Sequence, residues 1–546
     1  MQHKAELYEK TGLIPVFDYS AAAIKSDSLV PPELVAELQA AVRVLEDVPD
    51  HEKDWHPGSN EQVLDLVHPS LWPLIYGQSR ILTDRTIGVS DCLDYCGVGE
   101  VVPKTEEPVV ERSRPRYYFG QQDDKTPNLS HRFQWLPCNV TLEGSKAKID
   151  SYINNLHPAD HANFYPIIEK FIELSLPAWD LVYRWPSEYN RQRIACLDAR
   201  YTCKSPELCK RWCTPNNCPR DNRVHLTPEV LTGEVEVEGD ASEDESDDGF
   251  DEEEWDGDDI TDPRIRWFME THPMNVTETS PAQLKGPNAE DVKTSGFFDG
   301  SSRIQVIAKL ANIHLTPEKP TYDGGSWHLE GRLNEHICAT ALFYYDSDNI
   351  TDCRLSFRTT ANQEDLMMEL SYEQSDFFSI QRTFAIESNH TLQNIGGVLT
   401  RPGRSLFFPN IYQHRVSPFK LADPTRPGHR KILALFLVDP AIPVISTANV
   451  PPQQQEWWAR AAGVNTVLGH SVDAKASDGN VGKGKRSTIT SRLPVEVADM
   501  VVDNVEFPIS LKQAKEIRKE LIAERKILVQ DANNVLKSEE WNFCEH

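Results

Sequence analysis

Long hydrophobic runs are missing from this 546-residue sequence. No stretch reaches the about 18 uninterrupted apolar residues that a membrane-spanning helix needs. The longest apolar stretch, residues 432–438, has the length of a buried strand. The N-terminal residues lack the apolar segment of a secretory signal, and eleven cysteines without such a signal favour reduced thiols. We therefore expect an intracellular protein, cytoplasmic or nuclear, with no membrane partner.

An excess of basic charge is also missing. The net charge is −28, and seventeen acidic residues lie between Glu234 and Asp262 with no Lys or Arg among them; without them the net charge is −11. Nucleic-acid binding needs a basic face, so the composition argues against it. The self-repelling segment 230–262 is predicted to be a disordered acidic insertion. It is either a solvated loop or a docking site for a basic protein partner.

The motifs of several enzyme classes are absent as well. The sequence has no Gly-x-Ser-x-Gly elbow, Walker loop or dinucleotide fingerprint, which removes support for hydrolase, kinase and dehydrogenase functions. Four cysteines could offer thiolates for a structural zinc ion, but they lack the paired C-x2-C spacing of zinc ribbons, so reduced thiols are favoured. These four are Cys203, Cys209, Cys213 and Cys218.

The chain is predicted to contain five regions. Many short strands separated by Gly, Pro, Asp and Asn between about residues 300 and 445 indicate a sandwich or jelly roll. Apolar spacing predicts helices over residues 31–45, 162–174 and after Ser510, where Gln513 completes a capping box. The predicted regions are a helical N-terminal region (1–115), a mixed region that buttresses the core (116–229), the acidic insertion (230–262), a β core (263–450), and a linker with a C-terminal helical extension (451–546).

One group of residues carries chemistry. His328 and Glu330 are two positions apart, so in a strand both side chains project to one face. Of the 17 histidines, only His328 has an acidic residue two positions later. His414 and then Arg430 follow in the strand-rich region. Two histidines and a carboxylate can hold one face of Fe(II), and an arginine can grip a carboxylate with two hydrogen bonds. The alternative is that these residues are ordinary surface or hydrogen-bonded side chains.

The segments Ser151–Pro158, Gly325–His336, Ala339–Tyr345 and Leu406–Arg415 resemble a fungal family, domain-of-unknown-function family 4246. More broadly, Trp327–Gly331 with the later His and Arg segments is similar to the Fe(II)/2-oxoglutarate-dependent oxygenase superfamily. The resemblance implies an α+β protein with a double-stranded β-helix core, flanked by helices. It implies a dioxygenase that couples decarboxylation of 2-oxoglutarate to succinate with hydroxylation or demethylation of a substrate that the family does not reveal.

The resemblance implies His328, Glu330 and His414 as iron ligands and Arg430 as the ligand of 2-oxoglutarate. No catalytic residue beyond the metal site is expected. The sequence departs from the superfamily in using Glu rather than the commoner Asp, and in having Ile432 where a hydroxyl residue often follows the arginine. Tyr344, Tyr345 or Asn410 could replace that hydroxyl. The alternative function is a non-catalytic, cupin-like interaction protein whose acidic segment binds basic partners.

Overall fold

The computed structural model describes residues 2–18, 20–105, 129–189, 200–201, 274–275, 286–361, 381, 384–386, 391–463, 494, 497, 500–502 and 504–538. The chain divides into two units, each described by itself. Unit 1 comprises residues 1–191, 285–357 and 396–532, and unit 2 the rest. The acidic segment, the cysteine group at 203–218 and the linker at 471–488 lie outside the described residues.

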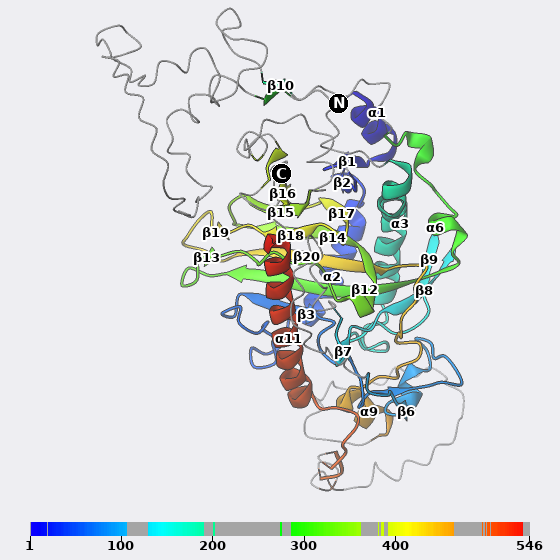
Figure 1. The fold of residues 1–546 in the computed structure, drawn as a ribbon. Helices are drawn as coiled ribbons and strands as arrows, with labels where there is room; N and C mark the ends of the chain where they lie inside the picture. Colours follow the sequence, from blue (N-terminus) through cyan, green and yellow to red (C-terminus); the bar gives the residue numbers. More distant parts are fainter. Residues whose placement is uncertain are drawn as a thin grey trace, which may run out of the picture. The chain divides into compact units, whose positions relative to one another are not determined.

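A nine-stranded sheet forms the centre of unit 1 (Figure 1). Its strand order is β1-β2-β17-β14-β20-β12-β8-β9, with β3 also paired to β12, and all its strand pairs are antiparallel. The strands are β1 (Ile14–Val16), β2 (Ala23–Ser26), β3 (Val63–Val67), β8 (Cys138–Glu143), β9 (Lys146–Ile149), β12 (Arg303–Leu315), β14 (Ile337–Asp348), β17 (Ser405–Pro409) and β20 (Gly428–Val438).

Smaller sheets accompany it. Strand β18 (Gln413–Val416) belongs to a three-stranded sheet in the order β16-β15-β18, with β15 at Cys353–Thr360 and β16 at Leu392–Thr400. The two-stranded pairs are β4 (Leu74–Ile75) with β7 (Phe133–Gln134), β5 (Arg80–Ile81) with β6 (Glu100–Val101), β13 (Thr321–Tyr322) with β19 (Phe419–Lys420), and, in unit 2, β10 (Arg200–Tyr201) with β11 (Met274–Asn275).

The two faces of the large sheet differ in chemistry. In β20, Leu433, Leu435 and Leu437 belong to the main hydrophobic core, together with the buried residues of helix α3 (Phe164–Glu188). Alternation along the strand places Arg430, Ile432, Ala434 and Phe436 on the opposite face. Figure 1 shows α3 beside the sheet, and the sheet strands that it contacts include β9, β14, β17 and β2. The second face is therefore free of α3 and carries Arg430.

The helices follow the apolar spacing of the sequence. The remaining ones are α1 (Gln2–Thr11), α2 (Pro32–Glu46), α6 (Phe297–Gly300), α9 (Gln455–Ala461) and α11 (Leu511–Ser538), with short 3-10 turns at Cys92–Tyr95, Ala289–Asp291 and Leu333–Glu335. Helix α3 continues well beyond the predicted residue 174 and contains Pro177 and Pro186. The capping box at the start of α11 is confirmed, because Ser510 and Gln513 exchange side-chain-to-backbone hydrogen bonds.

The strand predictions in the core are confirmed, with two omissions, the short β13 and the long β12. Strand β12, which pairs with β20, β3 and β8, was not predicted, because its buried residues follow one another without alternation. The N-terminal region was predicted to be mostly helical, yet it also supplies β1, β2 and β3 to the large sheet. The chain is thus a mixed α+β protein with a large antiparallel sheet. In the described residues, no helix is both long enough and apolar enough to span a membrane.

Candidate metal centre

His328, Glu330 and His414 come together although 84 residues separate the second from the third. Each offers one ligand atom, and these atoms all lie within 4.8 Å of one another. His328 is in the segment between β13 and the 3-10 turn at Leu333, and His414 is in β18. The exposed fraction of the side chain falls from 34% for His328 to 11% for Glu330 and 5% for His414. The group therefore has one accessible side and two sheltered members.

Backbone pairing sets the register of this group. His328 and His414 form an antiparallel bridge in which each amide N–H donates to the other's carbonyl, at 3.2 and 3.1 Å. The side chain of Asn410 continues the pairing: its Oδ1 accepts from the Glu330 amide at 2.9 Å, and its Nδ2 donates to the Glu330 carbonyl at 2.8 Å. The side-chain amide of Asn410 therefore substitutes for a strand neighbour and holds Glu330 beside the two histidines.

The distances suit one small cation. Glu330 Oε1 lies 3.7 Å from His328 Nε2 and 3.4 Å from His414 Nε2. Two ligands about 2.1 Å from one ion and at right angles to each other would be separated by about 3.0 Å. A shift of a few tenths of an ångström in each side chain is enough to reach that separation. The extra methylene of Glu330, compared with Asp, is accommodated without moving the backbone bridge.

The other ring nitrogens fix the tautomers. His328 Nδ1 is 2.8 Å from the carbonyl of Ser326, and His414 Nδ1 is 3.5 Å from the carbonyl of Tyr412. A carbonyl can only accept, so in the neutral imidazole Nδ1 holds the proton and Nε2 keeps a lone pair. Such contacts orient metal-ligating histidines. The donor set therefore fits a divalent cation.

The electrostatics agree with this assignment. Burial disfavours the charged form of Glu330, but the two adjacent imidazoles outweigh burial and hold its pKa well below the ordinary value. Burial and the neighbouring His328 lower the pKa of His414. Burial also opposes the charged form of His328, but Glu330 outweighs it and raises its pKa. In the absence of a cation, Glu330 is ionised, the form that a metal ligand needs.

Arg430 lies on the face of the large sheet that is opposite α3. It is near the start of β20, whereas Phe436 is near the end of the same strand. It is 3% exposed, and among the described residues it has no ion pair with a carboxylate. Its guanidinium carbon is 4.9 Å from the ring centre of Tyr344, which pairs with Ile432 in register. Neither Arg430 Nε nor the Tyr344 hydroxyl has a hydrogen-bond partner there. Burial raises the pKa of Tyr344, so it remains a neutral donor.

The structure separates the three candidates for the missing hydroxyl. Tyr344 faces Arg430. Tyr345, one residue on, points to the other face and donates to Asn312 at 3.2 Å. Asn410, predicted as a cofactor ligand, has its amide engaged by the backbone of Glu330 and of Ile337, the latter at 3.0 Å. Asn410 is thus placed to orient Glu330. The sequence could not distinguish this role from that of a 2-oxoglutarate ligand.

A second group that could hold a metal ion, His56, Asp65 and His68, was missed because its spacing matches no motif. Its tautomers suit a cation less well. His56 Nδ1 is 2.8 Å from Asp65 Oδ2, and the amide of Ser70 donates to His68 Nδ1 at 3.1 Å. His68 Nδ1 is therefore an acceptor and its Nε2 carries the proton, which removes that lone pair. Arg518, 3.5 Å from Asp65 Oδ2, already supplies a positive charge.

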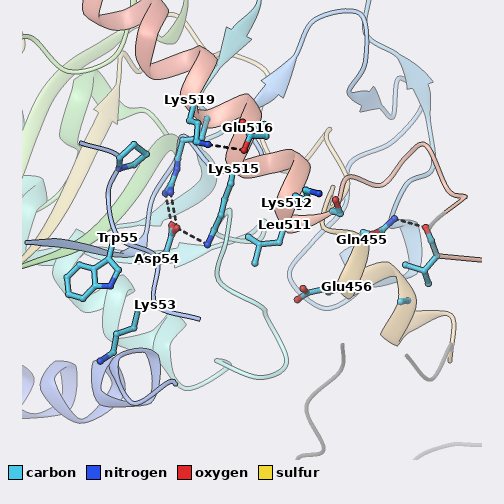
Figure 2. Close-up of a pocket in the computed structure, with 15 residues that line it drawn as sticks. Lys53, Asp54, Trp55, Gln455, Glu456, Leu511, Lys512, Lys515, Glu516 and Lys519 are labelled. Carbon is cyan, nitrogen blue, oxygen red and sulfur yellow. Dashed lines mark hydrogen bonds and ion pairs between the residues drawn. The ribbon is translucent and has the colours of Figure 1, made fainter. Parts of the chain in front are cut away.

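Figure 2 shows a cavity of about 660 Å³ elsewhere in unit 1, between α11, α9 and residues 53–57. Its charged lining is largely paired internally. Asp54 accepts two hydrogen bonds from Arg518, at 2.6 and 2.8 Å, and lies 3.5 Å from Lys515, while Lys519 pairs with Glu516 at 2.9 Å. None of the three residues of the His328 group lines it. The cavity is therefore separate from the candidate metal centre.

The comparison with protein families identifies the chain. The family described as "Protein of unknown function (DUF4246)" matches residues 1–461. The chain belongs to this family. The resemblance stated from the sequence segments is thereby confirmed. No curated protein matches the chain.

Solved structures match only part of the chain. The Fe(II)/α-ketoglutarate-dependent dioxygenase TqaL is 16% identical over 30% of this chain and 47% of that chain, with a TM-score of 0.17. A bsmA homologue from Methylobium petroleophilum PM1 is 16% identical over 26% and 43%, with a TM-score of 0.15. EvdO2 from Micromonospora carbonacea in complex with 2-oxoglutarate is 10% identical over 24% and 51%, with a TM-score of 0.13. The chain thus covers about half the length of each, and its reaction has to be argued from its own residues.

Proposed function

We propose that this chain is an Fe(II)/2-oxoglutarate-dependent oxygenase. The observation that carries the proposal is the convergence of His328, Glu330 and His414, with both Nε2 lone pairs free and Glu330 Oε1 between them. Two histidines and one carboxylate on one side of the ion leave positions for cosubstrate and O2. The buried Arg430, which has no carboxylate partner among the described residues, would supply the second half of the site.

The order of the strands supports a double-stranded β-helix core. From β12 to β20 the chain passes back and forth between the two sheets: β12, β14, β17 and β20 are in the large sheet, and the consecutive strands β15 and β16, and later β18, are in the small one. The His328 segment bridges to β18 and so joins the small sheet between β12 and β14. Two sheets that exchange strands in this way enclose their shared interior. His414 on β18 and Arg430 on β20 would both face it.

The chain's own residues would divide the work as follows. His328, Glu330 and His414 would hold Fe(II), which together with 2-oxoglutarate and O2 would supply oxidative decarboxylation to succinate and oxidation of a C–H bond. Arg430 grips the distal carboxylate of 2-oxoglutarate with two charge-assisted hydrogen bonds, and Tyr344 adds a third donor. Phe408, whose ring centre is 4.9 Å from that of His414, shields the inner side of the centre from water. The outcome is hydroxylation or demethylation.

Succinate formation tests the proposal. The full-length protein is incubated with Fe(II), ascorbate, 2-oxoglutarate and O2, and compared with His328→Ala and Arg430→Met. We expect succinate from the wild type and from the control His51→Ala, which changes an exposed histidine, but only background from the other two. Mn(II) titration calorimetry on the same proteins reports metal binding without turnover. Equal Mn(II) affinity in wild type and His328→Ala would refute the metal site, whereas binding without succinate would favour the non-catalytic interaction protein.

A further inference from the structure

We propose that Lys309 and His68 bind a carboxylate of the primary substrate beside the metal centre. The inference rests on the proposed oxygenase function and adds a substrate class to it. The two residues come from β12 and from the segment that follows β3, so no sequence motif links them. Three observations place them together: the strand pairing of the large sheet, the packing of aromatic rings around His68, and the balance of charges.

Lys309 is on the face of the large sheet that carries Arg430. It pairs with Ala434, and Arg430 pairs with Ile313, four residues further along β12. Positions 309 and 313 of β12 are an even number of residues apart, so Lys309 and Arg430 lie on the same face. At about 3.3 Å per residue the two positions are about 13 Å apart along the strand. The neighbouring residues Ala308 and Leu310 belong to the hydrophobic core on the opposite face.

Lys309 lies beside His68, because Leu310 of β12 pairs with Val67, the last residue of β3. Its positive charge acts on His328 of the metal centre and also on Asp65 and His68 of the second group. Among the described residues no hydrogen bond or ion pair engages its ammonium, although it is only half-buried. Asp65 forms no ion pair with Lys309, and its Oδ2 is hydrogen-bonded to His56 and lies 3.5 Å from Arg518.

His68 offers a second donor that is held rigidly. The Ser70 amide donates to its Nδ1, so Nε2 carries the proton. The ring packs edge-on against Trp135, with ring centres 6.3 Å apart, and Trp135 donates to the Ser70 hydroxyl at 3.0 Å. Trp135 in turn stacks on Phe436, which is on the Arg430 face of β20. This packing places the imidazole at the wall of the same interior.

The charge balance favours an anionic substrate. Fe(II), Glu330, doubly charged 2-oxoglutarate and Arg430 sum to zero. Asp54 and Asp65 are matched by Arg518 and Lys515. Of these described groups Lys309 is the cation without an ion-pair partner, and covering a cation with a bound substrate is costly without a counterion. A carboxylate that accepts from Lys309 and from His68 Nε2 would neutralise it.

The test uses a panel of straight-chain and aryl monocarboxylic acids, each paired with its primary amide as the neutral isostere. Melting temperatures are measured for the full-length protein with and without Mn(II) and 2-oxoglutarate, and succinate formation is measured with Fe(II). We expect at least one acid to bind better than its amide. Loss of a hydrogen bond to a charged group predicts binding of that acid about ten- to a hundredfold weaker in Lys309→Met. Lys309→Arg should retain part of the preference for the acid over its amide. The control Lys319→Met should retain all of it.

The outcomes separate the two proposals. If no acid binds better than its amide, or if the preference survives in Lys309→Met, the carboxylate site is wrong. It is also wrong if Lys309→Met raises the KM for 2-oxoglutarate as much as Arg430→Met does, because Lys309 would then serve the cosubstrate. If both His328→Ala and Glu330→Ala still bind Mn(II), the oxygenase proposal fails. The melting temperatures measured without metal still test whether Lys309 binds a carboxylate.

Discussion

Replacing Asn410 with alanine should weaken metal binding although Asn410 does not touch the metal. The substitution removes three hydrogen bonds, to the amide and carbonyl of Glu330 and to the carbonyl of Ile337, at 2.9, 2.8 and 3.0 Å. At about 0.5–1.5 kcal/mol each, the free energy of unfolding should fall by about 2–4 kcal/mol. Released from its register, Glu330 samples other positions. Loss of a residue that orients a ligand typically lowers metal affinity by about 10- to 100-fold.

The assay is Mn(II) titration calorimetry, with urea unfolding on the same samples. Asn349→Ala is the matched control, because the Asn349 side chain also donates to backbone carbonyls, those of Asp423 and Arg426 at 2.9 and 2.8 Å, and touches no residue of the metal group. Asn349→Ala should lose stability and keep Mn(II) affinity. If the two variants lose stability equally and neither loses Mn(II) affinity, Asn410 does not position Glu330 and our reading of the bridge is wrong.

Three further predictions concern other parts of the chain. Tyr344→Phe should raise the KM for 2-oxoglutarate about two- to tenfold, as expected for one hydrogen bond, measured by succinate formation. Arg525→Met should lower the free energy of unfolding in urea by about 3 kcal/mol, because it removes the cation that pairs with the fully buried Glu335 carboxylate. Hydrogen bonds from Arg404 lower the pKa of Asp27 to about 2, so its stabilising contribution is complete above about pH 4 and is lost towards pH 2; Asp27→Asn should flatten that part of the stability profile.

Each of these has a control. Tyr345→Phe, on the opposite face of β14, should leave the KM for 2-oxoglutarate unchanged. An equal KM effect in both tyrosine variants would point to a general change in the strand. Lys519→Met removes a cation of α11 that pairs only at the surface with Glu516, so it should cost less than about 1 kcal/mol. If Arg525→Met costs no more than Lys519→Met, the buried pair contributes little. A similar acid profile in wild type and Asp27→Asn would remove Asp27 from the explanation.

Local patterns predicted much of the fold. Apolar spacing, capping residues and turn residues act over a few positions, so α2, the start of α11 and most strands between residues 337 and 438 were predictable. Strand β12 was not, since a strand buried on both faces shows no alternation. The pairing of β1, β2 and β3 with the core strands depends on distant partners, which no local pattern contains.

The sequence by itself determined which residue types were available for a metal centre: the one His-x-Glu pair, followed by a histidine and an arginine in order. Only the tertiary structure decided what these side chains can do. The backbone bridge between His328 and His414 gives the ligand spacing, and carbonyls at Nδ1 leave both Nε2 atoms free. At His68 a backbone amide donates to Nδ1 instead, so the proton is on Nε2 and that atom has no free lone pair. The physical reason is that a tautomer is set by the neighbouring hydrogen-bonding group, and the tertiary fold determines which group that is.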